Sequence, residues 1–174
     1  DGGAEGAESL LVHLGEPLGN SAILGGVQRG TISISTAFDA WRISQFSTLE
    51  LADAGISGDL ADPDKDGIRN LLEYALNLSP KSSSAAGLPS SGIQNVSGQD
   101  YLTLTFRRLT PPLDLSYTPQ TNGSLDAGSW LSNAVQVGAP IVHGDGTETV
   151  TFRDATPISG ANRRFLQLKV TRTP

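Results

Sequence analysis

The chain has 174 residues with a formal net charge of −6, and it contains no cysteine and no methionine. The lack of cysteine excludes disulfides, thiolate metal sites and cysteine nucleophiles. Residues 1–98 hold 12 acids and 5 bases, whereas residues 99–174 hold 6 acids and 7 bases. An acidic half without a basic stripe argues against nucleic acid and anionic membrane surfaces as partners, and it favours cations.

The composition is that of a globular, turn-rich protein. Hydrophobic residues make up 37% of the chain and glycine occurs 20 times, which argues against disorder. No apolar run approaches the roughly 18–20 residues of a membrane span, so we expect no membrane insertion. Because residue 1 is not methionine, we expect a processed or truncated piece of a longer protein.

Residues 1–37 are expected to form β-structure. The runs SLLVHL (9–14) and GTISIS (30–35) are rich in β-forming residues, and turn residues separate them. Two strands cannot build a core on their own. We therefore expect residues 1–37 to pair with upstream domains of the same protein or with other copies of it.

Residues 38–80 are expected to be helical. Thr36 with Asp39, and Ser47 with Glu50, have the spacing of capping boxes. Apolar residues recur at helical spacing in two groups: Phe38, Trp41, Phe46 and Leu49, and then Ile68, Leu71, Leu72, Ala75 and Leu76. Asn77 is a candidate left-handed exit before Pro80. We expect Trp41 to be buried against the helix over 68–78.

The rest of the chain is expected to be a linker, residues 81–98, followed by a small antiparallel β-sandwich, residues 99–174. Residues 101–106, 147–152 and 164–170 alternate between apolar and polar, and weaker strands fit residues 113–118 and 132–138. The Asp-Gly pair at 145–146 indicates a hairpin turn. The predicted fold class is mainly β with a small α-helical calcium-binding insert.

The segment DPDKDGIRNLLE, residues 62–73, has the ligand spacing of an EF-hand loop. Calcium takes six to eight oxygen ligands, and alternate residues of a tight loop can supply them. The predicted ligands are Asp62, Asp64, Asp66, the Ile68 carbonyl, Asn70 (directly or through water) and Glu73, with Gly67 at the sharp turn. The alternatives are a solvated acidic turn that caps the helix, and Mg²⁺ in place of Ca²⁺.

The aliphatic residue Ile68 occupies position 7 of the loop, where EF-hands usually have it at position 8. This variant, in DPDKDGIRNLLEYALNLSP, resembles the calcium loops of thrombospondin type 3 repeats and dockerins. With the helix FDAWRISQF before it and RRFLQLKVT near the end, residues 37–174 resemble a C-terminal module of large secreted proteins of Verrucomicrobia and related bacteria. The resemblance implies bound Ca²⁺, a secreted or cell-surface location and a non-catalytic role.

The first 35 residues resemble the second half of a Calx-β domain, a calcium-associated sandwich. In that family three acids precede a strand, and Asp1, Glu5 and Glu8 fit those positions. The resemblance makes these residues candidate ligands for a second calcium ion. Solvated surface acids are the alternative reading of all three.

No enzyme is expected. His13 and His143 lie in different predicted segments, and neither G-x-S-x-G nor H-E-x-x-H occurs, although a carboxylate-pair glycosidase stays open. The predicted function is a calcium-stabilised extracellular structural or adhesion module, or a subunit of a surface filament or lattice joined through residues 1–37. The alternatives are a secretion or surface-sorting domain, and a carbohydrate-binding appendage of a secreted enzyme that stacks a glycan on Trp130 and Tyr117.

Overall fold

The computed structural model describes residues 36–83, 85–110, 114–126, 128–160 and 163–173. All of these belong to one compact unit, Ile34–Pro174. The predicted Calx-β-like strands in residues 1–35 lie outside the described residues, as do the candidate ligands Asp1, Glu5 and Glu8.

Four short α-helices come first in the described chain. They are α1 (Ala37–Gln45), α2 (Thr48–Leu51), α3 (Ala54–Ser57) and α4 (Asn70–Leu76). Both predicted capping boxes are confirmed, because Thr36 and Asp39 exchange hydrogen bonds at the start of α1, and Ser47 and Glu50 do so at the start of α2. Asn77 ends α4 with a φ of 57°, which confirms the left-handed exit.

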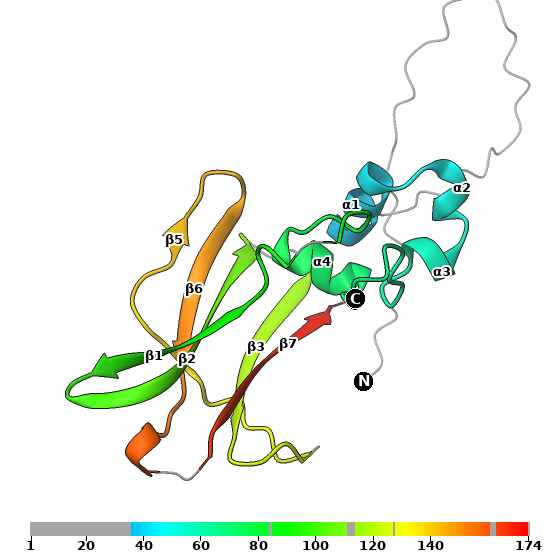
Figure 1. Ribbon diagram of the computed structural model, residues 1–174. Coiled ribbons are helices and arrows are strands. Elements are labelled where there is room, and N and C mark those ends of the chain that lie inside the picture. The colour runs from blue at the N-terminus through cyan, green and yellow to red at the C-terminus, as the bar shows by residue number, and fades with distance from the viewer. Residues whose placement is uncertain (1–35, 84, 111–113, 127, 161–162, 174) are drawn as a thin grey trace, which may run out of the picture. The chain divides into compact units, whose positions relative to one another are not determined.

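The remainder of the chain is β-structure in two antiparallel sheets (Figure 1). The five-stranded sheet has the order β1-β2-β6-β4, with β5 also pairing with β6, and the two-stranded sheet joins β3 to β7. The strands are β1 (Ser90–Val96), β2 (Gln99–Leu109), β3 (Leu115–Asn122), β4 (Val135–Gln136), β5 (Ile141–Val142), β6 (Thr147–Arg153) and β7 (Phe165–Arg172), and a 3₁₀ turn, η1, covers Ile158–Gly160. The protein is therefore mainly β with a few short helices, as predicted.

The strongly alternating segments give the long strands β2, β6 and β7, and the predicted hairpin lies between β5 and β6. There the amide of His143 donates to the carbonyl of Thr147 at 3.0 Å. The linker prediction for residues 81–98 is wrong over β1. Ser97 and Gly98 both have positive φ, at 54° and 82°, and form a two-residue turn that brings β1 against β2.

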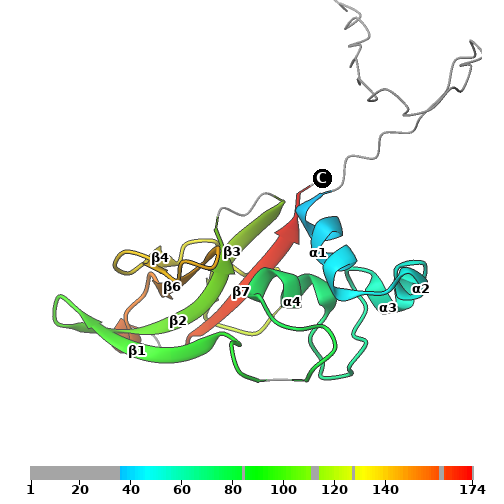
Figure 2. The same ribbon diagram turned by 90° about the horizontal axis from the view of Figure 1, so that it is seen from above.

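The core consists of two apolar clusters, and α4 contributes to both. One contains Phe38, Tyr74, Ala75 and Leu115, and the other contains Leu76, Leu104, Phe106 and Val150. Figure 2 shows α4 lying beside β7, so the helical segment packs directly on the strands. Helices and sheets thus share their core.

Trp41 contacts α4 as predicted, although it is only half-buried. Its ring centroid lies 5.5 Å from that of Tyr74 and 5.4 Å from that of Phe38. Leu49, predicted on the same apolar face, is 86% exposed. That prediction is wrong because α1 ends at Gln45 and α2 starts a new helix, so the helical spacing does not continue across them.

Two buried carboxylates join elements that are far apart in sequence. Asp114 accepts hydrogen bonds from the Phe38 amide at 2.8 Å and from the Tyr74 hydroxyl at 2.9 Å, which fixes α1 and α4 at the start of β3. Asp154 follows β6 in the chain and is fully buried, and it forms a bidentate ion pair with Arg164. Arg164 Nε donates to Asp154 Oδ2 at 2.6 Å, and Arg164 Nη2 donates to Oδ1 at 2.7 Å. Arg164 also donates to the Thr121 hydroxyl at 3.1 Å, so this pair links the two sheets.

We expect Asp114→Ala to lower the free energy of unfolding by about 3 kcal/mol. The change leaves the buried Phe38 amide and Tyr74 hydroxyl without an acceptor, and each unsatisfied buried group costs roughly 1–3 kcal/mol. The measurement is urea unfolding, with Asp126→Ala in an exposed turn as the matched control, expected to cost under about 1 kcal/mol. If the two variants lost the same free energy of unfolding, Asp114 would not be the buried acceptor described here.

Candidate metal centre

The acidic loop connects α3 to α4 and is fastened at its far end by the first residues of α4. The Asn70 amide donates to the Ala61 carbonyl at 2.9 Å, and the Leu71 amide to the Asp59 carbonyl at 3.0 Å. The side-chain nitrogen of Asn70 also donates to the carbonyls of Ile56 and Gly58, each at 2.9 Å. These hydrogen bonds join the two ends of the loop, so they hold it closed without an ion.

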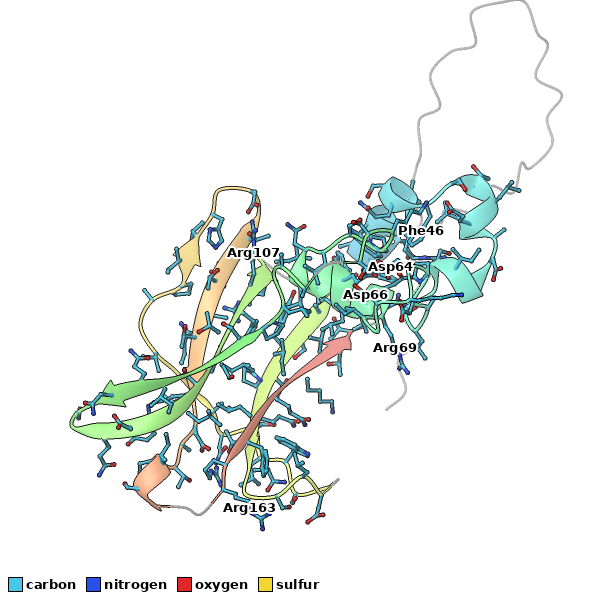
Figure 3. The ribbon with its side chains drawn as sticks, viewed as in Figure 1. Phe46, Asp64, Asp66, Arg69, Arg107 and Arg163 are labelled. Atoms are coloured by element: carbon cyan, nitrogen blue, oxygen red, sulfur yellow. The ribbon has the colours of Figure 1, made fainter. Side chains whose placement is uncertain are left out.

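Three aspartates come together inside this loop. One carboxylate oxygen from each of Asp62, Asp64 and Asp66 lies within 4.8 Å of the others. Gly67, with a φ of 90°, makes the sharp turn that this requires and donates its amide to Asp62 Oδ2 at 2.9 Å. In Figure 3, Asp64 and Asp66 lie next to each other beside α4, whereas Arg69 points away from them.

Local backbone amides use one oxygen of each aspartate. The Asp66 amide donates to Asp64 Oδ1 at 3.2 Å, and the Ile68 amide donates to Asp66 Oδ1 at 2.8 Å. These short-range hydrogen bonds hold the carboxylates in the loop. Ile68 lies directly before Arg69, the N-cap of α4, and its carbonyl stays a predicted ligand.

Four side-chain oxygens at this loop are buried and have no hydrogen-bond partner among the described residues. They are Asp62 Oδ1, Asp64 Oδ2, Asn70 Oδ1 and Glu73 Oε2. Asn70 is fully buried and Glu73 is 1% exposed. A buried acceptor without a partner costs about 1–3 kcal/mol, and more when it is charged. A bound cation would satisfy these acceptors together.

Glu73 belongs electrostatically to the aspartate cluster. Its burial, followed by the charges of Asp64, Asp66 and Asp62, raises the pKa of Glu73 to about 7. In the absence of a positive charge, the Glu73 carboxyl therefore holds a proton at pH values where an ordinary glutamate is ionised. A cation bound at the cluster would instead favour the ionised form of the Glu73 carboxyl.

The donor set fits a hard divalent cation. All candidate ligand atoms are oxygens, which Ca²⁺ and Mg²⁺ prefer. Two oxygens bound to one Ca²⁺ at 2.3–2.6 Å can be at most about 5.2 Å apart, and the 4.8 Å spread of the three aspartates falls within that limit. The structure thus brings the predicted ligands Asp62, Asp64 and Asp66 together. Asn70 and Glu73 each contribute a buried oxygen without a hydrogen-bond partner among the described residues, and both stay predicted ligands.

The sequence did not indicate the second role of Asn70, which is to tie α4 to the end of α3. Its nitrogen is occupied by the carbonyls of Ile56 and Gly58, so Oδ1 is the atom left to face a ligand. At the end of α3, a Cβ on Gly58 would lie 2.5 Å from the Ala54 carbonyl oxygen, so glycine is required there. No spacing rule signals such a contact, because its acceptors are backbone atoms.

The predicted glycan platform of Tyr117 and Trp130 has no support from the position of Tyr117. The Tyr117 hydroxyl donates to the Ala75 carbonyl at 2.6 Å, and its ring stacks on Phe106 with centroids 6.2 Å apart. Burial raises the pKa of Tyr117 to about 12, as expected for a phenol held inside the protein. The exposed His143 pairs with the Thr149 hydroxyl at 2.7 Å, and His13 lies outside the described residues.

No protein-family model, no curated protein and no solved structure matches this chain. Within the described residues, none of the helices has both the length and the apolar character needed to cross a membrane.

In metal-free buffer, we expect stability to fall as pH rises from about 4.5 to about 7. Glu73 binds its proton more tightly in the folded than in the unfolded chain, so its stabilising effect is complete below its ordinary pKa and is lost through pH 7. A shift from 4.5 to about 7 corresponds to roughly 3 kcal/mol. Urea unfolding at pH 5 and pH 8 measures it.

The control for this pH dependence is Glu73→Gln, which cannot ionise and should lose most of the difference between the two pH values. If the metal-free wild-type protein is equally stable at pH 5 and pH 8, the carboxyl is not buried among the aspartates as described.

Proposed function

We propose that residues 62–73 bind one calcium ion, and that the ion stabilises a non-enzymatic, extracellular module with a structural or adhesive role. The observation that carries this proposal is the set of four buried, unpartnered oxygens on Asp62, Asp64, Asn70 and Glu73. When bound, the ion supplies positive charge to these acceptors. The loop then needs no proton on Glu73.

The choice of calcium rests on the ligands and their number. Four carboxylates and an amide oxygen give a strongly negative, oxygen-only site, and a terminal glutamate can bind calcium through both oxygens. Magnesium requires near-ideal octahedral geometry and keeps several waters, so a crowded set of protein oxygens suits it less. Zinc prefers nitrogen and sulfur ligands, and this loop contains neither histidine nor cysteine.

The ion would stabilise more than the loop, because Glu73 is followed by three residues that hold the rest of the fold. The Tyr74 hydroxyl donates to Asp114, the Ala75 carbonyl accepts from Tyr117, and Leu76 is 1% exposed in the cluster between α4 and the strands. An ion fastened to Glu73 would therefore restrain the packing of helices on sheets. In this role calcium acts as a rigid joint.

The extracellular setting is supported by the type of site. Extracellular modules use oxygen-ligand calcium sites of this kind, with affinities of roughly 10⁻⁴–10⁻³ M. The resemblance of residues 37–174 to the C-terminal module of large secreted bacterial proteins points the same way. Assembly into a surface filament or lattice through residues 1–37 stays a proposal about a segment that lies outside the described residues, apart from Thr36 and Ala37.

We expect one calcium ion per chain by isothermal titration and a higher melting temperature in calcium than in chelator. At a calcium concentration 100 times Kd, binding to the folded state alone adds about 2.7 kcal/mol of stability. Glu73→Gln should remove most of this calcium dependence, because it takes away the buried carboxylate that joins the ion to α4.

The matched control is Asp126→Asn, which removes one negative charge from an exposed turn remote from the loop in sequence. It should keep the full calcium response. Identical melting of the wild-type protein in calcium and in chelator would refute the proposed function, and a response to Mg²⁺ alone would assign the site to magnesium.

A further inference from the structure

Within the described part of the chain, the strand β1 forms a free edge of the five-stranded sheet. Among the described strands it pairs only with β2, and all of its residues are exposed except the half-buried Val96. Figures 1 and 2 both show the β1–β2 hairpin projecting away from the helices. Ile93, in the middle of the strand, is 68% exposed.

The other described edges carry features that discourage pairing between molecules. Prolines, charged residues and very short strands protect sheet edges. In the two-stranded sheet β3 contains Pro119 and β7 contains Lys169, and at the far edge of the larger sheet β4 and β5 have two residues each. β1 has no charge and no proline, and its register with β2 runs without a bulge from Ser90 to Val96.

The free hydrogen-bonding groups of β1 can be assigned from its turn. Ser97 and Gly98 form a two-residue turn, so Val96 and Gln99 beside it form a hydrogen-bonded pair. In an antiparallel ladder, bonded residues alternate with residues whose amide and carbonyl groups point to the other side. These outward groups belong to Ser91, Ile93 and Asn95.

We propose that β1 pairs antiparallel with β1 of a second copy of the chain, across a two-fold axis at Ile93. Ile93 is the central residue of this seven-residue strand, so this register places Ile93 opposite its own counterpart and aligns the strand along its whole length. It also places Ser91 opposite Asn95, so all three outward-facing residues meet a bonding partner. The two exposed isoleucines become a cross-strand apolar pair.

Charge and geometry both favour a closed dimer. Since β1 carries no charged residue, no like charges face each other across the axis. A two-fold contact uses the same surface on both chains and therefore closes after two copies. The opposite edge of the sheet consists of the two-residue strands β4 and β5, which offer little template for further growth. This contact is separate from the calcium loop and does not depend on it.

The test is sedimentation equilibrium of the full chain in calcium buffer from about 5 μM to 1 mM. One strand pair buries less than the roughly 800 Å² per partner of a standard interface, so we expect a monomer–dimer equilibrium in the micromolar range or weaker. Ile93→Lys places two ammonium groups together at the axis and should weaken dimerisation at least tenfold. Thr171→Lys, which adds the same charge at an exposed position of β7, should leave it unchanged.

A second variant tests the axis directly. The chain has no cysteine, so Ile93→Cys introduces a single thiol at the exposed centre of β1. A short bifunctional thiol reagent should link this variant into covalent dimers, whereas Thr171→Cys should not be cross-linked. A wild-type chain that is monomeric at all concentrations, or unchanged dimerisation in Ile93→Lys, would overturn the proposal.

Discussion

The burial of the Glu73 carboxylate beside three aspartates is the constraint on which the rest of this structure depends. The group is 1% exposed, one of its oxygens has no hydrogen-bond partner among the described residues, and burial with the neighbouring charges raises its pKa to about 7. At an effective dielectric constant of about 20, two unit charges 4.8 Å apart repel by roughly 3.5 kcal/mol. A bound cation, or a proton on Glu73, relieves this repulsion.

The position of Glu73 connects this electrostatic problem to the whole fold. It lies in a seven-residue helix whose next three residues contact Asp114, Tyr117 and the apolar cluster under the larger sheet. A helix this short has little stability of its own, so tertiary contacts must hold it. The charge state of Glu73, at the centre of α4, therefore acts on a helix that contacts both sheets.

Local patterns predicted the local structure well. The capping boxes at Thr36 and Ser47, the left-handed Asn77 and the alternation in β2, β6 and β7 depend on neighbouring residues and are confirmed. The same holds for the spacing of Asp62, Asp64 and Asp66, which converge in the structure. These features need only a few residues of chain, so short-range chemistry determines them.

Features that depend on distant contacts could not be predicted. β1 looks like a linker because an exposed edge strand needs no apolar alternation, and only its pairing with β2 defines it. Asp114 contacts Phe38 across 76 residues, and no local pattern distinguishes it from a surface aspartate. The Tyr117 hydroxyl reaches Ala75 on a helix 42 residues earlier in the chain, and no local pattern indicates this contact.

The most direct test of the central claim is hydrogen exchange of the backbone amides with and without calcium. Because α4 joins the acidic loop to both sheets, removal of calcium should speed exchange in α4 and in β3 near Tyr117, while the turn at Ser97 and Gly98 keeps its rate. The same measurement on Glu73→Gln should show no calcium effect in α4. Exchange that changes only within residues 62–69, or not at all, would contradict the account.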